Sequence, residues 1–150
     1  MKRFVWRLQR VLDVRKKQEE IKRIELFRLT ETLAGKQSEL LMRRRALQDM
    51  IERIAGDTSP ERLRAQEFFL KQAATNDEQI RELCKEIAAL ESRQKEKTAE
   101  LLIIRRSRDS LDRLRAETRE RFFREHEKLE QKELDDRATI TFVCADNREG

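Results

Sequence analysis

The sequence predicts an all-α fold, a long antiparallel two-helix coiled-coil hairpin with an overhanging C-terminal helix. Charged residues make up 43% of the 150 residues and hydrophobic ones only 37%, a balance typical of long helices and coiled coils. There are three Gly and one Pro, so the turns that a sheet requires are scarce. Apolar residues recur at alternating steps of three and four, which favours helices with one buried stripe over disorder.

The chain is expected to form one coiled-coil unit over residues 1–150, with a first helix at about residues 3–55. Gly35 weakens this helix without ending it. The apolar stripe contains Leu8, Leu12, Leu26, Leu29, Leu33, Leu40, Leu47, Met50 and Ile54, with Arg15, Glu19, Lys22, Lys36 and Arg43 as polar interruptions. A second stripe indicates a register shift or a third packing surface; it consists of Val11, Val14, Ile21 and Ile24.

The one clear break is a turn at residues 56–59. Gly56 suits the left-handed residue that follows a helix end. Ser59 suits an N-cap, and Pro60 suits the first position of the next helix. A short connection between two long helices predicts an antiparallel hairpin.

The second helix is expected at about residues 60–139, followed by a frayed tail at residues 140–150. Residues 74–77 are its weakest stretch and predict a kink or a brief loop. One apolar stripe contains Leu63, Leu70, Ala73 and Ile80. A shifted one contains Leu83, Ile87, Leu90, Leu101, Ile104, Leu111, Phe122 and Leu129.

The unequal helix lengths predict a partner at the open end of the hairpin. If residue 55 faces residue 60, residue 3 faces about residue 112 and roughly the last 30 residues overhang. An isolated helix that presents Phe122, Phe123, Leu129 and Leu134 to water is a binding surface or an unstable element. The basic residues 1–17 would also lie beside the basic residues 105–115, so something else is expected to compensate their repulsion.

The sequence predicts no enzyme, no cofactor and no metal site. His126 is the only histidine and lies among charged residues, and Cys84 and Cys144 match no metal or redox spacing. We interpret the cysteines as reduced thiols of a cytosolic protein. The acidic pair Asp135-Asp136 lacks a pocket that would desolvate it. No transmembrane segment and no secretory signal are recognised.

Three other partner classes stay open at this point. The basic, amphipathic N-terminus suits an anionic membrane surface, although we favour its role as the start of the coiled coil. Arg43, Arg44 and Arg45 would suit a nucleic acid, but acids are interspersed along the chain and no nucleic acid is expected. A homodimeric tether is the last alternative.

Both ends of the chain resemble the FliJ family of flagellar export proteins. Phe4-Val5-Trp6-Arg7-Leu8-Gln9-Arg10-Val11-Leu12-Asp13-Val14-Arg15 resembles the basic and aromatic opening of that family. Glu130-Gln131-Lys132-Glu133-Leu134-Asp135-Asp136-Arg137-Ala138 resembles its C-terminal signature. The length and the break near residue 58 also match.

This resemblance implies a non-enzymatic coiled-coil stalk in the flagellar type III export apparatus. Its implied partners are the hexameric export ATPase, the cytoplasmic domain of the export gate membrane protein, and export chaperones. The implied ATPase-facing residues are Leu8, Leu12, Arg15, Gln131, Leu134 and Asp135, and the implied gate-facing residues are Phe68, Phe69 and Leu70. The implied location is cytoplasmic, peripherally associated with the inner membrane at the flagellar base. A virulence type III secretion stalk would share this physical design.

Overall fold

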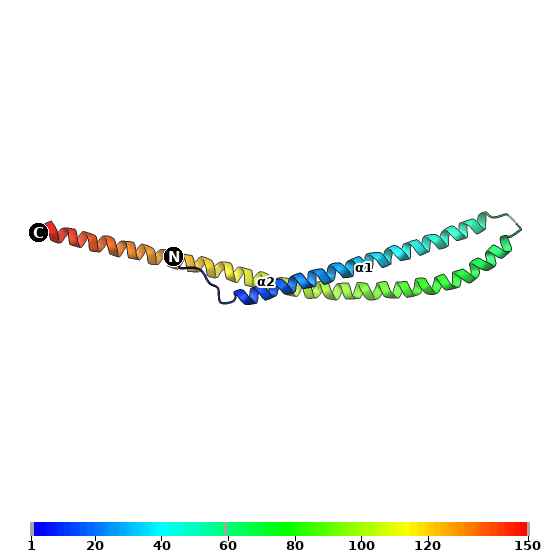
Figure 1. Cartoon of the computed structure of the whole chain (residues 1–150), viewed down its shortest axis with the longest axis horizontal. Coiled ribbons are helices and arrows are strands. Elements are labelled where there is room, and N and C mark those ends of the chain that lie inside the picture. Colours follow the sequence, from blue (N-terminus) through cyan, green and yellow to red (C-terminus); the bar gives the residue numbers. More distant parts are fainter. Residues whose placement is uncertain (1, 59, 150) are drawn as a thin grey trace. The chain divides into compact units, whose positions relative to one another are not determined.

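The computed structural model describes residues 2–58 and 60–149, and two helices account for the regular structure there. These are α1 (Gln9–Gly56) and α2 (Arg62–Glu149), which pack against each other. This confirms the predicted all-α helical hairpin (Figure 1). Contacts divide the chain into two compact units. The hairpin unit spans residues 19–103, and the terminal unit combines residues up to 18 with residues from 104 onward.

In the hairpin unit, α1 and α2 run side by side in opposite directions (Figure 1). The apolar stripe predicted for α1 faces α2, because its members are buried or half-buried while their neighbours are exposed. Leu33, Leu83 and Ile87 form the centre of this seam, and Leu40 and Leu90 pack against them. A two-helix hairpin has no third layer, so the core is a single stripe.

Pairs of polar side chains define the register of the hairpin unit. Lys22 meets Glu100, Lys36 meets Glu86, and Arg43 donates a hydrogen bond to Gln79. The expected register placed Lys22 opposite about residue 93. The observed pairing is therefore displaced by about seven residues, one heptad, which keeps the apolar stripes facing each other.

The stripe of α2 keeps most of the predicted positions and differs from the prediction at Leu63, Leu70 and Leu129. Buried and half-buried positions continue at steps of three and four from Phe69 through Leu83 and Ile87. Leu63 and Leu70 lie off this stripe and are exposed. Residues 74–77 are helical, so the predicted loop is absent there. Neighbouring turns of a long helix hold this weak stretch in place, since adding a residue to an existing helix costs far less than starting one.

The second apolar stripe of α1 lies away from α2. Val11, Val14, Ile21 and Ile24 are all exposed. No other part of the described residues covers them, so the predicted third packing surface is not found within the chain.

The connection between the helices is as short as predicted but differs in detail. Gly56 is the last residue of α1 and does not adopt a positive φ. The amide of Asp57 donates to the carbonyl of Ile54, which closes the last turn without a left-handed residue. Pro60 lies in a turn before α2 begins at Arg62. Ser59, the predicted N-cap, lies outside the described residues.

The terminal unit begins with a non-helical segment, where the sequence predicted helix from about residue 3. We call residues 2–8 the N-terminal strap; α1 starts only at Gln9. Trp6 is 8% exposed, whereas its neighbour Val5 is 83% exposed. An extended segment places residues i and i+2 on one side, and here Trp6 is buried and Phe4 is half-buried. Two large aromatic anchors override the helical periodicity here.

The basic segments of the terminal unit are compensated by nearby polar groups. Arg115 donates a hydrogen bond to Gln9 at 2.8 Å. Lys16 lies 4.0 Å from Asp112, which also pairs with Arg108 at 3.0 Å. The repulsion expected between residues 1–17 and 105–115 is thus offset by an amide and an aspartate.

The C-terminal part of α2 is helical to Glu149, where the sequence predicted a frayed tail from residue 140. Every side chain from Glu127 to Glu149 is exposed. Threonines in this stretch donate to the carbonyl four residues earlier, as Thr139 does to Asp135. The β-prone residues continue the helix because no strand is there to pair with them.

Candidate partner-binding site

An aromatic cluster joins the N-terminal strap to α2 in the terminal unit. The rings of Phe4 and Phe122 lie 5.5 Å apart, and Phe122 meets Phe123 edge to face at the same distance. His126 stacks on Phe122 at 6.2 Å with an interplanar angle of 4°. Phe122 was expected to be open to water; the strap half-buries it instead.

The cluster has a charged rim. The guanidinium of Arg119 lies 5.5 Å above the Phe123 ring, a cation–π contact. His126 Nε2 lies 3.2 Å from Glu130 Oε1 without the alignment of a hydrogen bond. The lone histidine therefore packs as an aromatic side chain in this cluster, whereas the sequence suggested a solvated surface residue.

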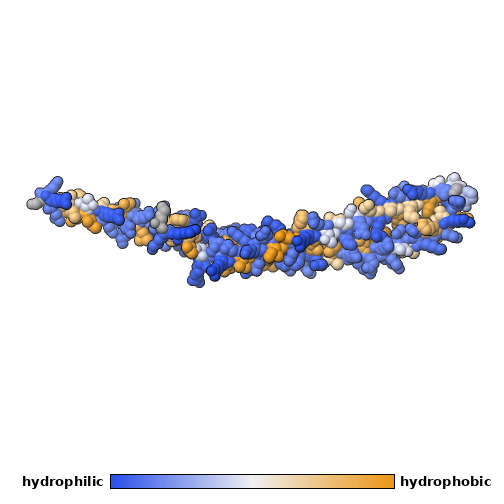
Figure 2. Space-filling model, in the orientation of Figure 1, coloured by the Kyte–Doolittle hydropathy of each residue, from blue (hydrophilic) through white to orange (hydrophobic). Residues whose placement is uncertain are grey.

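Beyond the cluster, α2 presents apolar side chains that its own chain does not cover. Leu134, predicted to face the ATPase, is 59% exposed. Gln131 and Asp135, predicted with it, are exposed and hydrogen-bonded to each other at 3.2 Å. The other large apolar residues exposed here are Leu129, Ile140, Phe142 and Val143. At the end that is marked C in Figure 1, Figure 2 shows hydrophobic atoms at the surface among hydrophilic ones.

The N-terminal residues predicted for the same site lie in the seam of the terminal unit. Leu12 is 1% exposed, and Leu8 and Arg15 are half-buried. Arg15 donates a hydrogen bond to Gln18 at 3.0 Å. Gln9 contacts Arg115, and residues 115 and 131 are about 24 Å apart along the helix at 1.5 Å per residue. The structure therefore does not bring the two predicted groups together, and Leu12 is not available to a partner.

Residues Phe68, Phe69 and Leu70, predicted to face the export gate, divide between two faces of α2. Phe69 is half-buried in the hairpin seam, whereas Phe68 and Leu70 are exposed. Phe68 borders a shallow hollow with Lys71, Gln72, Thr75, Asn76 and Gln79. Leu70 does not line this hollow, so the exposed residues Phe68 and Leu70 do not form one continuous surface.

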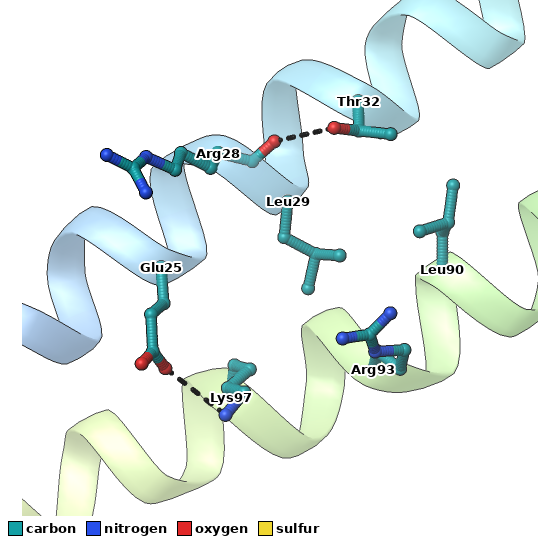
Figure 3. Close-up of a pocket in the computed structure, with 7 residues that line it drawn as sticks. All are labelled: Glu25, Arg28, Leu29, Thr32, Leu90, Arg93 and Lys97. Atoms are coloured by element: carbon teal, nitrogen blue, oxygen red, sulfur yellow. Dashed lines mark hydrogen bonds and ion pairs between the residues drawn. The ribbon is translucent and has the colours of Figure 1, made fainter.

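A groove opens between the helices of the hairpin unit. Leu29 projects from α1 and Leu90 from α2, with Arg93 beside them (Figure 3). Thr32 donates to the carbonyl of Arg28 at 3.0 Å and does not bridge the helices. The groove is open to solvent along its length, so it offers no enclosed volume in which water could be excluded from a reaction.

A ring of four charges closes one end of this groove. Lys22 lies 2.9 Å from Glu100 and 3.6 Å from Glu25, and Lys97 lies 3.2 Å from Glu25 and 3.6 Å from Glu100. We call these side chains the charge quartet. The sequence analysis identified Lys22 as a seam interruption but not its partners, since only the register brings Glu100 opposite to it.

Ion pairing within the quartet shifts the pKa values of Glu25, Glu100 and Lys22. A hydrogen bond from Lys97 lowers the pKa of Glu25, and one from Lys22 lowers the pKa of Glu100. The hydrogen bond to Glu100 raises the pKa of Lys22 above its ordinary value. All these groups are solvated, so the quartet orients the helices rather than preparing an acid or a base.

The described residues contain no group of three His, Cys, Asp or Glu side chains positioned to hold a metal ion. Neither helix, within its described length, contains a stretch apolar enough to span a bilayer. Cys84 is half-buried and Cys144 exposed, and both are free.

Comparison with known proteins assigns the family. The family described as flagellar FliJ protein matches residues 3–145. No curated protein and no solved structure matches the chain. The matched range includes all of α1, the strap from Arg3 and α2 as far as Ala145, so the chain belongs to the FliJ family and has a role in flagellar protein export.

Proposed function

We propose that this chain is a non-enzymatic coiled-coil stalk of the flagellar export apparatus. In this role it binds the hexameric export ATPase, promotes ATP hydrolysis and links the ATPase to the export gate and to export chaperones. It would act in the cytoplasm, peripherally at the inner membrane of the flagellar base. Family membership supports flagellar export over the equivalent virulence system.

The observation that carries the proposal is the exposed C-terminal stretch of α2. Helices gain most of their stability from packing an apolar face. Between Glu127 and Glu149 every side chain faces solvent, including Leu129, Leu134 and Phe142. A surface of this kind is typical of a docking element, and the export ATPase is the partner that the family suggests.

A stalk of this kind needs no catalytic group. One asymmetric helix in a six-fold ring contacts each subunit differently, so it stabilises some subunit conformations over others. Differential binding of this kind is sufficient to favour ring assembly and to bias nucleotide states.

The paired charges of the hairpin unit argue against a nucleic-acid scaffold. Lys22, Lys36 and Lys97 each pair with a glutamate, and Arg43 pairs with Glu39 at 3.3 Å. Phosphate binding would have to displace these acids. We therefore expect no salt-dependent retardation of DNA or RNA at low micromolar concentrations of the chain.

The test uses the purified full chain and the flagellar export ATPase. We expect co-elution and faster ATP hydrolysis with the wild-type chain, and loss of both with Leu134→Asp, which places a charge on the docking face. Leu63→Asp is the matched control, because Leu63 is also exposed, at 73% against 59% for Leu134, but lies in the hairpin unit. A Phe68→Ala/Leu70→Ala variant should still bind the ATPase but no longer bind the cytoplasmic domain of the export gate protein. Unchanged hydrolysis together with no co-elution of the wild-type chain would refute the proposal.

A further inference from the structure

In the terminal unit, the segment that covers the apolar stripe of α2 changes at the first residue of α1. Gln9, the first residue of α1, contacts Arg115 of α2. The half-buried stripe of α2 continues past this contact through Thr118, Phe122 and His126. Phe122 meets Phe4 of the N-terminal strap, and His126 stacks on Phe122. The strap is not helical and lies beside α2 as the thin dark-blue segment in Figure 1.

The strap is attached in a different way from α1. Its two anchors are the Phe4 ring on Phe122 and the buried Trp6, and the amide of Gln9 donates to the carbonyl of Trp6 at 3.2 Å. A non-helical segment lacks the internal hydrogen bonds that make a helix cooperative. Release of Phe4 and Trp6 therefore frees the strap as far as the half-buried Leu8, where it joins α1.

Charge complements the aromatic anchors. The strap carries Lys2, Arg3 and Arg7 and no acidic residue. The α2 stretch at residues 117–136 has an excess of acids over bases, with Glu120, Glu127 and Glu130 close to the aromatic cluster in sequence. A basic segment with two apolar anchors is thus the ligand that this face of α2 already binds.

We infer that the N-terminal strap is a removable cover over an α2 docking surface centred on Phe122 and His126. The external occupant is a basic segment with apolar anchors, which takes the place of the strap. When the strap leaves, this surface joins the exposed stretch that begins at Glu127 into one continuous face. The identity of the occupant as part of the export ATPase rests on the proposed function; the existence of the cover does not.

The first arm of the test uses Trp6, the single tryptophan of the chain, as a reporter. In the full-length protein its emission should be blue-shifted and shielded from acrylamide. Phe122→Ser should shift the emission to the red and increase quenching to the level of an exposed indole. Val5→Ser, which alters the exposed side of the strap, should leave the signal unchanged. Equal quenching in wild type and Phe122→Ser would overturn the inference.

The second arm asks whether the surface binds a segment supplied from outside. The probe is a peptide with the sequence of residues 2–8, and the receptor is the full chain with Phe4→Ser and Trp6→Ser, so that the only tryptophan belongs to the peptide. We expect a blue shift on mixing with this open variant, and none when Phe122→Ser is added. The wild-type chain should bind the peptide at least about tenfold more weakly, because its own strap is at a high effective concentration. If the peptide bound equally to the wild-type chain, the open variant and the open variant with Phe122→Ser, or bound to none of them, the inference that the strap is a removable cover would be contradicted.

The third arm identifies the partner. A cover that is mostly closed reduces apparent affinity by the fraction of open molecules. The open variant should therefore bind the export ATPase at least about threefold more tightly than wild type, with Val5→Ser as the unchanged control. Weaker binding by the open variant would make the strap part of the interface and overturn the inference. If no variant binds the ATPase, the proposed function fails, and the peptide arm alone decides whether the cover exists.

Discussion

At the scale of single residues, polar side chains within the seam decide which residues face each other. Lys22 and Lys97 occupy stripe positions that apolar residues would otherwise fill, and each reaches glutamates on both helices. Exposed ion pairs contribute little free energy. Their value here is specificity, because a shifted pairing would leave lysines in the seam without carboxylates.

The charge quartet predicts a pH dependence of stability. Glu25 and Glu100 have pKa values lowered below the ordinary 4.5, so their contribution is complete above pH 4.5 and is lost as the pH falls through the lowered values. Lys22 has a raised pKa, so its contribution is complete below its ordinary value of 10.5 and is lost at higher pH. The free energy of unfolding, measured with urea across this pH range, should therefore decline at both the acidic and the alkaline limit.

The variant that checks this assignment is Glu25→Gln/Glu100→Gln, which should make the acid decline shallower. Glu82→Gln removes an exposed glutamate that pairs with Lys85 at 3.6 Å within α2. It is the control, and its acid decline should match that of wild type. An unchanged acid decline in the double variant would show that the quartet does not contribute to it.

At the scale of the elements, α1 contains a position that is not optimal for its own helix. Gly35 lies in the interior of α1, exposed, with no side chain to restrict the unfolded backbone. A Cβ built at Gly35 meets nothing within 4 Å. Gly35→Ala should therefore raise the free energy of unfolding by about 0.5–1 kcal/mol.

Chemical denaturation followed by helical circular dichroism measures this effect. Gly56→Ala is a useful comparison, since a Cβ there is also free of contacts but the residue ends α1. Its stabilisation should be smaller than that of Gly35→Ala. If Gly35→Ala lowered the free energy of unfolding instead, the absence of a side chain at this position would be required for stability.

At the scale of the whole molecule, the stability of the fold and the binding of a partner are expected to depend on different parts of the chain. Residues 127–149 bury no side chain, so deleting residues 127–150 should leave the thermal midpoint within about 2 °C of wild type. The same deletion should abolish ATPase binding under the proposed function. Differential scanning calorimetry measures the midpoint.

A longer deletion provides the contrast. Removing residues 119–150 also removes Phe122, which packs on Phe4 of the strap, and His126, which stacks on Phe122. The midpoint should then fall and Trp6 should become exposed. A large fall in midpoint with the shorter deletion would mean that the C-terminal stretch contributes to the fold.

The sequence by itself determined the helices and the buried face of α1. Alternating steps of three and four are a property of one helix, so Leu26, Leu33 and Leu40 could be assigned to the seam without knowing the partner. Phe68 and Phe69 are adjacent, so one of them had to be exposed, and Phe68 is.

Only the tertiary structure decided the register, the strap and the covering of Phe122. A displacement by one heptad leaves both stripes in contact, so periodicity cannot distinguish Lys22 opposite Glu100 from Lys22 one heptad away. The strap depends on rings that are distant in sequence, Phe4 and Phe122. A helical pattern is repeated within each segment, so it can be recognised in the sequence. The register across a hairpin depends on the difference in free energy between alternative arrangements of both helices, so it cannot be recognised in either segment alone.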